Sequence, residues 1–202
     1  MSLRLKAAAL WTPERAMRRM LDTVDAATTA ALDDLLRRCG ATPSPAPAGG
    51  GGRAAGGMGA ARAAMAAGHD ARVRALVDAV GRDQAVELGR QALRPVGVRL
   101  GQEAREELSV GDGPRELEMA ARVLYRALGI HFELGRGPDG TMLMRVDRCA
   151  LARHYSEEAC LILSAADEGV VAGLSPGSSM LFEQRMTGGC ETCLARITGA
   201  GA

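Results

Sequence analysis

The sequence predicts an α+β protein in which N-terminal helices are followed by two antiparallel β-hairpins that flank a cysteine-containing helix. Apolar residues recur at helical spacing through most of residues 12–128, and the period changes to two at Ile130–Leu134. Turn residues at 137–140 and at 187–192 interrupt the two alternating regions. The order helices, ββ, α, ββ favours a small antiparallel sheet with helices on one face.

Composition narrows the classes of protein that need to be considered. The chain has 202 residues with a net charge of +1, so neither nucleic acid nor an anionic membrane is favoured by charge. Aromatic residues make up only 2%, which argues against base-stacking surfaces. The sequence has no apolar run of about 18 residues, and its N-terminal apolar run is too short for a signal peptide. We therefore expect a cytoplasmic protein without nucleic-acid or membrane contacts.

The chain divides into three segments. Residues 1–39 contain an amphipathic helix at 12–39, capped by Thr12 with Pro13 in its first turn, which could pack on its own domain or form a homo-oligomer. Residues 40–60 are rich in Pro, Gly and Ala, and we expect a disordered linker there. Residues 61–202 form the main domain.

The elements of the main domain follow in order. Apolar stripes predict a helix near 73–80, a longer helix from Asp83 to Leu100 with a kink at Pro95, and a helix from Pro114 to Gly129. The first hairpin covers residues 130–146. Helical character returns over 148–173, with an interruption expected at Ser156, and the second hairpin covers 180–197.

Four of the five cysteines lie between Cys149 and Cys193. Cys190 and Cys193 form a Cys-x-x-Cys pair in a glycine-rich turn, a spacing typical of zinc and iron sites. Cys149 and Cys160 are the candidates for the remaining ligands, with Glu183 and His154 as substitutes. The alternative is that Cys190 and Cys193 are simply two partly buried thiols.

Cys160 and Asp167 are expected on one helix face, because seven residues correspond to about 700° of rotation. Their Cα atoms would be roughly 10 Å apart. This span is too long for shared ligation of one ion but suits two groups that hold the ends of a small molecule. The alternative is that Cys160 is a core residue and that Asp167 and Glu168 form a solvated edge.

The C-terminal half resembles the L-2-amino-thiazoline-4-carboxylate hydrolase family. The resemblance is carried by the segment Val146–Cys149, by Cys160, by residues 167–176, by Phe182–Gly189 and by Cys193–Arg196. It covers about residues 115–198. The same scaffold is similar to the 4-vinyl reductase small-molecule-binding domain.

The first resemblance implies hydrolytic opening of a small cyclic C–N/C–S substrate. The Cys160 thiolate or an activated water would attack the amidine-like carbon, with Asp167 or Glu168 as general acid or base. Arg185 or Arg196 would hold the substrate carboxylate.

The second resemblance implies a non-catalytic sensor that binds a small ligand and carries a structural metal. Zinc is the implied ion, and Cys160, Glu183 and Cys193 are the implied ligands. A third interpretation is an interaction protein that uses helix 12–39.

Overall fold

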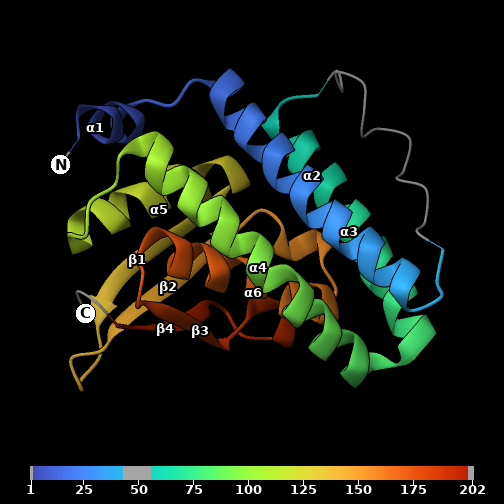
Figure 1. Cartoon of the computed structure of the whole chain (residues 1–202). Coiled ribbons are helices and arrows are strands. Elements are labelled where there is room, and N and C mark those ends of the chain that lie inside the picture. The colour runs from blue at the N-terminus through green and yellow to red at the C-terminus, as the bar shows by residue number, and fades with distance from the viewer. Residues whose placement is uncertain (1, 43–55, 200–202) are drawn as a thin grey trace.

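The computed structural model describes residues 2–42 and 56–199, and it confirms the α+β fold class (Figure 1). Five helices come first: α1 (Leu3–Leu10), α2 (Glu14–Arg38), α3 (Met58–Val80), α4 (Arg82–Leu108) and α5 (Pro114–Leu128). They are followed by β1 (Ile130–Arg136), β2 (Met142–Cys149), α6 (Glu157–Leu174), β3 (Ser179–Gln184) and β4 (Cys193–Thr198). Short 3-10 helices, η1 (Ala152–His154) and η2 (Met186–Gly188), precede α6 and follow β3.

Both predicted hairpins form, and they join in one antiparallel sheet with the order β1-β2-β4-β3. The last strand therefore lies inside the sheet. Alternate residues of the strands are buried on the face that meets the helices, and they include Phe132, Met144, Val146, Met180, Cys193 and Ala195. The outer face carries ion pairs instead, such as Arg145 with Glu133 at 2.7 Å.

The helices cover one face of this sheet in two layers (Figure 1). α5 and α6 contact the strands directly, and α4 packs along α6 on the side away from the sheet. α2 and α3 lie beside each other and extend the helical layer. A cluster that includes Leu32, Val73, Leu93 and Ile162 joins α2, α3, α4 and α6, so the helical layer has a common core.

α4 and α6 approach each other through glycine. A Cβ atom at Gly97 would overlap the carbonyl oxygen of Ala166, and one at Gly169 would overlap the carbonyl oxygen of Arg94. Gly101 and Gly173 make the same kind of contact one turn further along. Because the two backbones touch, the position of α6 is fixed by α4, and so is the face that α6 presents to the sheet.

The N-terminal segment differs from the prediction in two respects. α2 begins at Glu14 and its N-cap is Pro13, because the Thr12 hydroxyl donates to the carbonyl oxygen of Ala8 and not to the start of α2. In addition, the eight-residue helix α1 precedes it. The apolar stripe of α2 packs against α3 and α4 of the same chain through Leu21, Leu32, Leu35 and Leu36. An oligomer formed through this helix stays a prediction.

The expected linker coincides only partly with the described chain. Residues 43–55 lie outside the described residues, and α3 begins at Met58, inside the segment predicted to be disordered. α4 continues through Pro95 as one helix. Ser156 caps α6 as expected, accepting a hydrogen bond from the Ala159 N–H at 3.2 Å. Within residues 2–42 and 56–199, no helix combines the length and apolar character needed to cross a membrane.

Candidate functional site

A cavity of about 90 Å³ lies between α6 and the inner face of the sheet, and we call it the thiol cavity. It brings Cys149, Cys160 and Cys193 into one lining. Its other walls come from α2, α3, α5, η1 and the turn after β3. Most of the lining is apolar and includes Met65, Leu128, Met144, Val146, Leu163, Phe182 and Met186.

α6 supplies the polar side of the thiol cavity. Cys160, Ser164 and Asp167 recur at helical spacing and all line it, as the helical period predicted for Cys160 and Asp167. The helix is held at its start by Asp70, whose carboxylate accepts a hydrogen bond from the Ser156 N–H at 2.7 Å. This anchor and the contact with α4 set which residues face the cavity.

The carboxyl group of Asp167 has a raised pKa. Burial raises its pKa to about 7, an effect increased by Glu168 and opposed by the Tyr125 hydroxyl and by Arg185. The residue keeps some accessible surface, which fits its position on the cavity wall. Asp167 can therefore hold or release a proton near neutral pH, which is the property required of a general acid or base.

The pKa values of the three thiols are raised, which disfavours the reactive thiolate form. Burial raises the pKa of Cys149 to about 11, and it also raises the pKa values of Cys160 and Cys193. The Met186 N–H donates to the Cys193 Sγ atom at 3.4 Å, and Thr187 lies close enough to Cys160 to oppose its shift. Because the thiolate is the nucleophilic form, these thiols are weak nucleophiles at neutral pH.

Arg185 is the cation of the thiol cavity. Its Nη2 atom donates to the Ser164 hydroxyl at 3.1 Å, its Nη1 atom donates to the Phe182 carbonyl oxygen at 3.4 Å, and its guanidinium lies 5.3 Å from the Phe182 ring centre. Its Nε atom is buried, and no acceptor for it is present among the described residues. Those residues also provide no ion-pair partner for Arg185 within 4.0 Å. Burial lowers its pKa.

Three predicted site residues lie elsewhere. Glu168 is 1% exposed and faces α4, where it pairs with Arg90 at 2.8 Å and Arg94 at 3.5 Å, so it does not reach the thiol cavity. Glu183 and Arg196 pair with each other at 2.8 Å on the outer face of the sheet. Alternation along β3 and β4 puts them on the opposite side from Cys193.

The predicted metal ligands do not converge. Cys190 is exposed at the turn before β4, Glu183 is paired outside the sheet, and His154 does not line the thiol cavity. Across residues 2–42 and 56–199, no three His, Cys, Asp or Glu side chains are grouped so that they could hold one ion. A zinc ion stays a prediction, and the remaining thiols do not form a complete ligand set for it.

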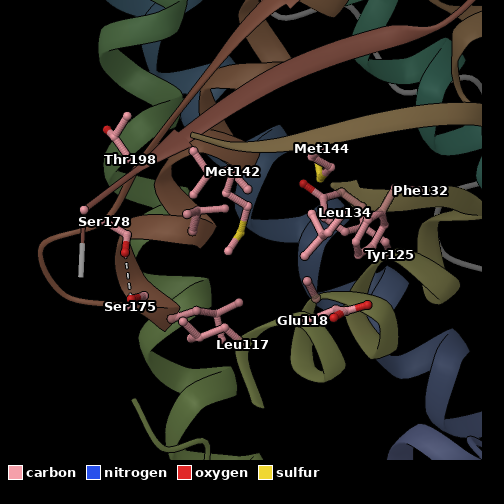
Figure 2. A pocket seen from close by; sticks show the side chains of 15 residues that line it. Leu117, Glu118, Tyr125, Phe132, Leu134, Met142, Met144, Ser175, Ser178 and Thr198 are labelled. Carbon is pink, nitrogen blue, oxygen red and sulfur yellow. Dashed lines mark hydrogen bonds between the residues drawn. The ribbon is translucent and has the colours of Figure 1, made fainter. Parts of the chain in front are cut away.

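A second cavity of about 60 Å³ adjoins the first on the same face of the sheet (Figure 2). Tyr125 and Met144 line both cavities and so separate them. Figure 2 shows Leu117, Phe132 and Leu134 among its apolar walls, with the hydrogen-bonded pair Ser175 and Ser178 at one end, whose hydroxyl oxygens are 2.8 Å apart. The Tyr125 hydroxyl is buried, and no hydrogen-bond partner within 3.5 Å is present for it in the described chain. Burial raises the pKa of Tyr125, and the nearby Asp167 carboxylate raises it further.

His69 is a polar residue of the thiol cavity that the sequence analysis did not select. It is 1% exposed, its Nε2 atom lies 2.9 Å from the Thr28 hydroxyl, and its Nδ1 atom lies 2.9 Å from the Tyr155 hydroxyl. Its interaction with Asp25, whose carboxylate is 3.4 Å from Nε2, lowers the pKa of that acid. The sequence held one local signal: His69 lies four residues after Met65 and four before Val73, so the three share one helix face.

Comparison with known proteins adds a likeness in fold. No protein-family model matches the chain, and neither does any curated protein sequence. The structure is similar to that of a trafficking protein particle complex subunit 3 from Naegleria fowleri, which is covalently bound to palmitic acid. The TM-score is 0.53 at 13% sequence identity, and the match covers 68% of this chain and 94% of that one. At this identity the two chains share a fold, which spans almost the whole of the neighbour.

Proposed function

We propose that the protein is a small-molecule-binding module whose ligand is a carboxylate with an apolar body. The supporting observation is the guanidinium of Arg185, which lies against an apolar cavity without an ion-pair partner among the described residues. A partly buried charge with no ion-pair partner and with a buried Nε–H that lacks an acceptor costs free energy, and a carboxylate ligand would supply both the opposite charge and hydrogen-bond acceptors. This corresponds to the sensor interpretation of the sequence, with Arg185 in the place given to a carboxylate clamp.

The apolar body of the ligand would extend from Arg185 toward Tyr125 and Met144. The lining there is apolar, and the second cavity continues it beyond these two side chains. The structural neighbour carries palmitic acid, so this fold accepts an apolar ligand in at least one protein. That protein is also a subunit of a complex, which is consistent with the third interpretation, in which the present chain is an interaction protein.

Binding of carboxylates tests the proposal directly. Benzoate, hexanoate, octanoate and L-2-amino-thiazoline-4-carboxylate would be titrated into the protein by calorimetry, with octanol as the uncharged control. Arg185→Met should weaken carboxylate binding about ten- to hundred-fold, because it removes charged hydrogen bonds. Arg196→Met is the matched control on the outer face of the sheet and should bind as the wild type does. Equal affinity for octanoate and octanol, or an equal loss in both variants, would contradict the proposal.

Hydrolysis is the second candidate function, and the titration of Asp167 favours it. The raised pKa values of the thiols disfavour a Cys160 thiolate, so water is the better nucleophile. Asp167 would take one proton from the water as the water oxygen adds to the amidine-like carbon, and it would pass that proton to the ring nitrogen. When the ring C–S bond breaks, the remaining proton on the added oxygen would pass through Asp167 to the departing sulfur, which leaves the carbonyl group of carbamoyl-cysteine.

The two candidates differ in their response to L-2-amino-thiazoline-4-carboxylate. A hydrolase would release carbamoyl-cysteine, and Asp167→Asn would reduce the rate by about 10²–10⁴-fold. Cys160→Ala would retain activity if water is the nucleophile and lose it if the thiolate is. A protein that binds the compound without opening its ring would be the binding module.

A further inference from the structure

α1 carries a concentration of exposed apolar side chains outside both cavities. Leu3 is 82% exposed, Leu10 is 86% exposed and Trp11, which caps the helix, is 73% exposed. Among the described residues, the other large hydrophobic side chain with comparable exposure is Leu181 on β3, at 57%. Exposed apolar residues that gather on one short helix indicate a contact surface.

The opposite face of α1 holds the helix on the body of the protein. Leu5 is fully buried and packs in a cluster with Ala104, Val110, Ala120 and Leu174. The Ser2 hydroxyl donates to the Leu108 carbonyl oxygen at 2.7 Å, and Arg126 donates to the Ala9 carbonyl oxygen at 3.0 Å. These contacts keep the Leu3 and Leu10 side chains directed away from the core.

The charged side chains within this segment are of one sign. Arg4 and Lys6 are both exposed, and residues 1–13 contain no Asp or Glu, although the whole chain has a net charge of only +1. At 100° per residue, Leu10 falls about 20° from Leu3, while Arg4 and Lys6 lie about 100° and 60° away on opposite sides. The apolar stripe therefore has a basic residue on each flank.

The net charge of the whole chain favoured no membrane contact, but this segment is basic, and we propose that this face of α1 binds the surface of a membrane that contains anionic lipids. Leu3 and Leu10 would enter the boundary between head groups and acyl chains, and Trp11 would lie at head-group depth. The aliphatic stems of Arg4 and Lys6 would lie along the apolar surface, and their charged ends would reach the lipid phosphates. The charge pattern disfavours a second copy of the chain as the occupant, because a symmetric contact would bring the bases of two helices together without an acid from residues 1–13.

Trp11 is the only tryptophan of the sequence, so its fluorescence reports on this face alone. The full chain would be titrated with vesicles of phosphatidylcholine and of phosphatidylcholine with about one-third phosphatidylserine. We expect a blue shift and quenching by brominated lipid with the anionic vesicles. Added salt should weaken the binding, since it screens the two bases.

Variants separate the apolar and the electrostatic contributions. Leu10→Ser should weaken vesicle binding about ten-fold or more, and Lys6→Ala should weaken it about five-fold. Leu181→Ser is the matched control, since it removes an exposed leucine from β3, and it should bind as the wild type does. All of these side chains are exposed, so the melting temperature should stay unchanged in each variant.

Three outcomes would overturn this proposal. The first is the absence of a blue shift with anionic vesicles, and the second is an equal loss of binding in Leu10→Ser and Leu181→Ser. The third is a blue shift that depends on protein concentration without lipid, since it would assign the face to a second copy of the chain.

Discussion

The Arg185 guanidinium donates to the hydroxyl of Ser164 at 3.1 Å, and this bond joins the turn after β3 to the middle of α6. Ser164 lies one turn from Cys160 in one direction and one turn from Asp167 in the other. The bond therefore places the cation of the thiol cavity midway between the thiol and the carboxyl group that the sequence selected.

Removal of that hydroxyl should affect binding more than stability. Ser164→Ala leaves the charge of Arg185 but frees its orientation, so we expect a several-fold loss of carboxylate affinity and about 1 kcal/mol of lost stability. Calorimetry and urea denaturation would measure the two effects. Ser179→Ala removes an exposed hydroxyl that lies 2.8 Å from the Thr198 hydroxyl, and it should leave affinity unchanged. Unaltered affinity in Ser164→Ala would show that Arg185 is positioned by other contacts.

Asp167 should make stability depend on pH. Burial raises its pKa from 3.8 to about 7, so between these values the folded protein keeps a proton that the unfolded chain has released. The contribution to stability is thus complete below about pH 4, declines as pH rises toward 7, and is lost above it. The affinity for carboxylates should fall over the upper part of this range, because ionised Asp167 repels them.

The variant Asp167→Asn tests this sign. Its melting temperature should exceed that of the wild type at pH 8, and the decline between pH 4 and 7 should become smaller. Asp139→Asn serves as the control, because hydrogen bonds from Thr141 and then from Arg196 lower the pKa of Asp139. Its contribution is lost only as pH falls through the acid range. An unchanged decline in Asp167→Asn would show that another group titrates.

Thiol labelling should follow exposure. Cys190 is exposed, whereas burial raises the pKa values of Cys149, Cys160 and Cys193. At pH 7 iodoacetamide should therefore modify Cys190 well before these three, as followed by peptide mass spectrometry. A bound carboxylate should slow the labelling of Cys160 further. Labelling of Cys160 as rapidly as Cys190 would revive the thiolate mechanism.

The contact between α4 and α6 should be sensitive to a single methyl group. Gly169→Ala would force the new Cβ atom onto the Arg94 carbonyl oxygen, and we expect a loss of about 1–3 kcal/mol in the free energy of unfolding. Gly188→Ala, at a position where a Cβ atom meets no other atom within 4 Å, is the control. Equal stability of both variants in urea would mean that α6 can move away from α4.

The sequence predicted the fold class and one side of the thiol cavity because both depend on local periodicity. The helical period puts Cys160 and Asp167 on one face whatever packs against it. The alternation of side chains along a strand would have excluded Arg196 from the cavity. Cys193 and Arg196 are three residues apart on one strand, so they lie on opposite faces of the sheet. Arg196 was therefore wrongly expected to hold the substrate carboxylate, because its charge was considered without the alternation of side chains along β4.

Other features depend on contacts distant in sequence. Glu168 follows Asp167 directly, but it is directed to Arg90 and Arg94, which come more than 70 residues earlier. Nothing local to α6 indicates that α4 would lie on that side. The cavity wall that His69 provides likewise depends on where α3 packs, and the short helix α1 has too few turns for its period to be recognised.

The place of β4 in the sheet has a consequence for biosynthesis. β4 follows the other three described strands in the sequence and leaves the ribosome after them, yet it lies between β2 and β3 and brings Cys193 into the thiol cavity. Until it is available, β2 has an unpaired edge and β3 has no neighbour in the sheet. The helices can pack early in synthesis, but the thiol cavity can be completed only after residues 193–198 have been translated.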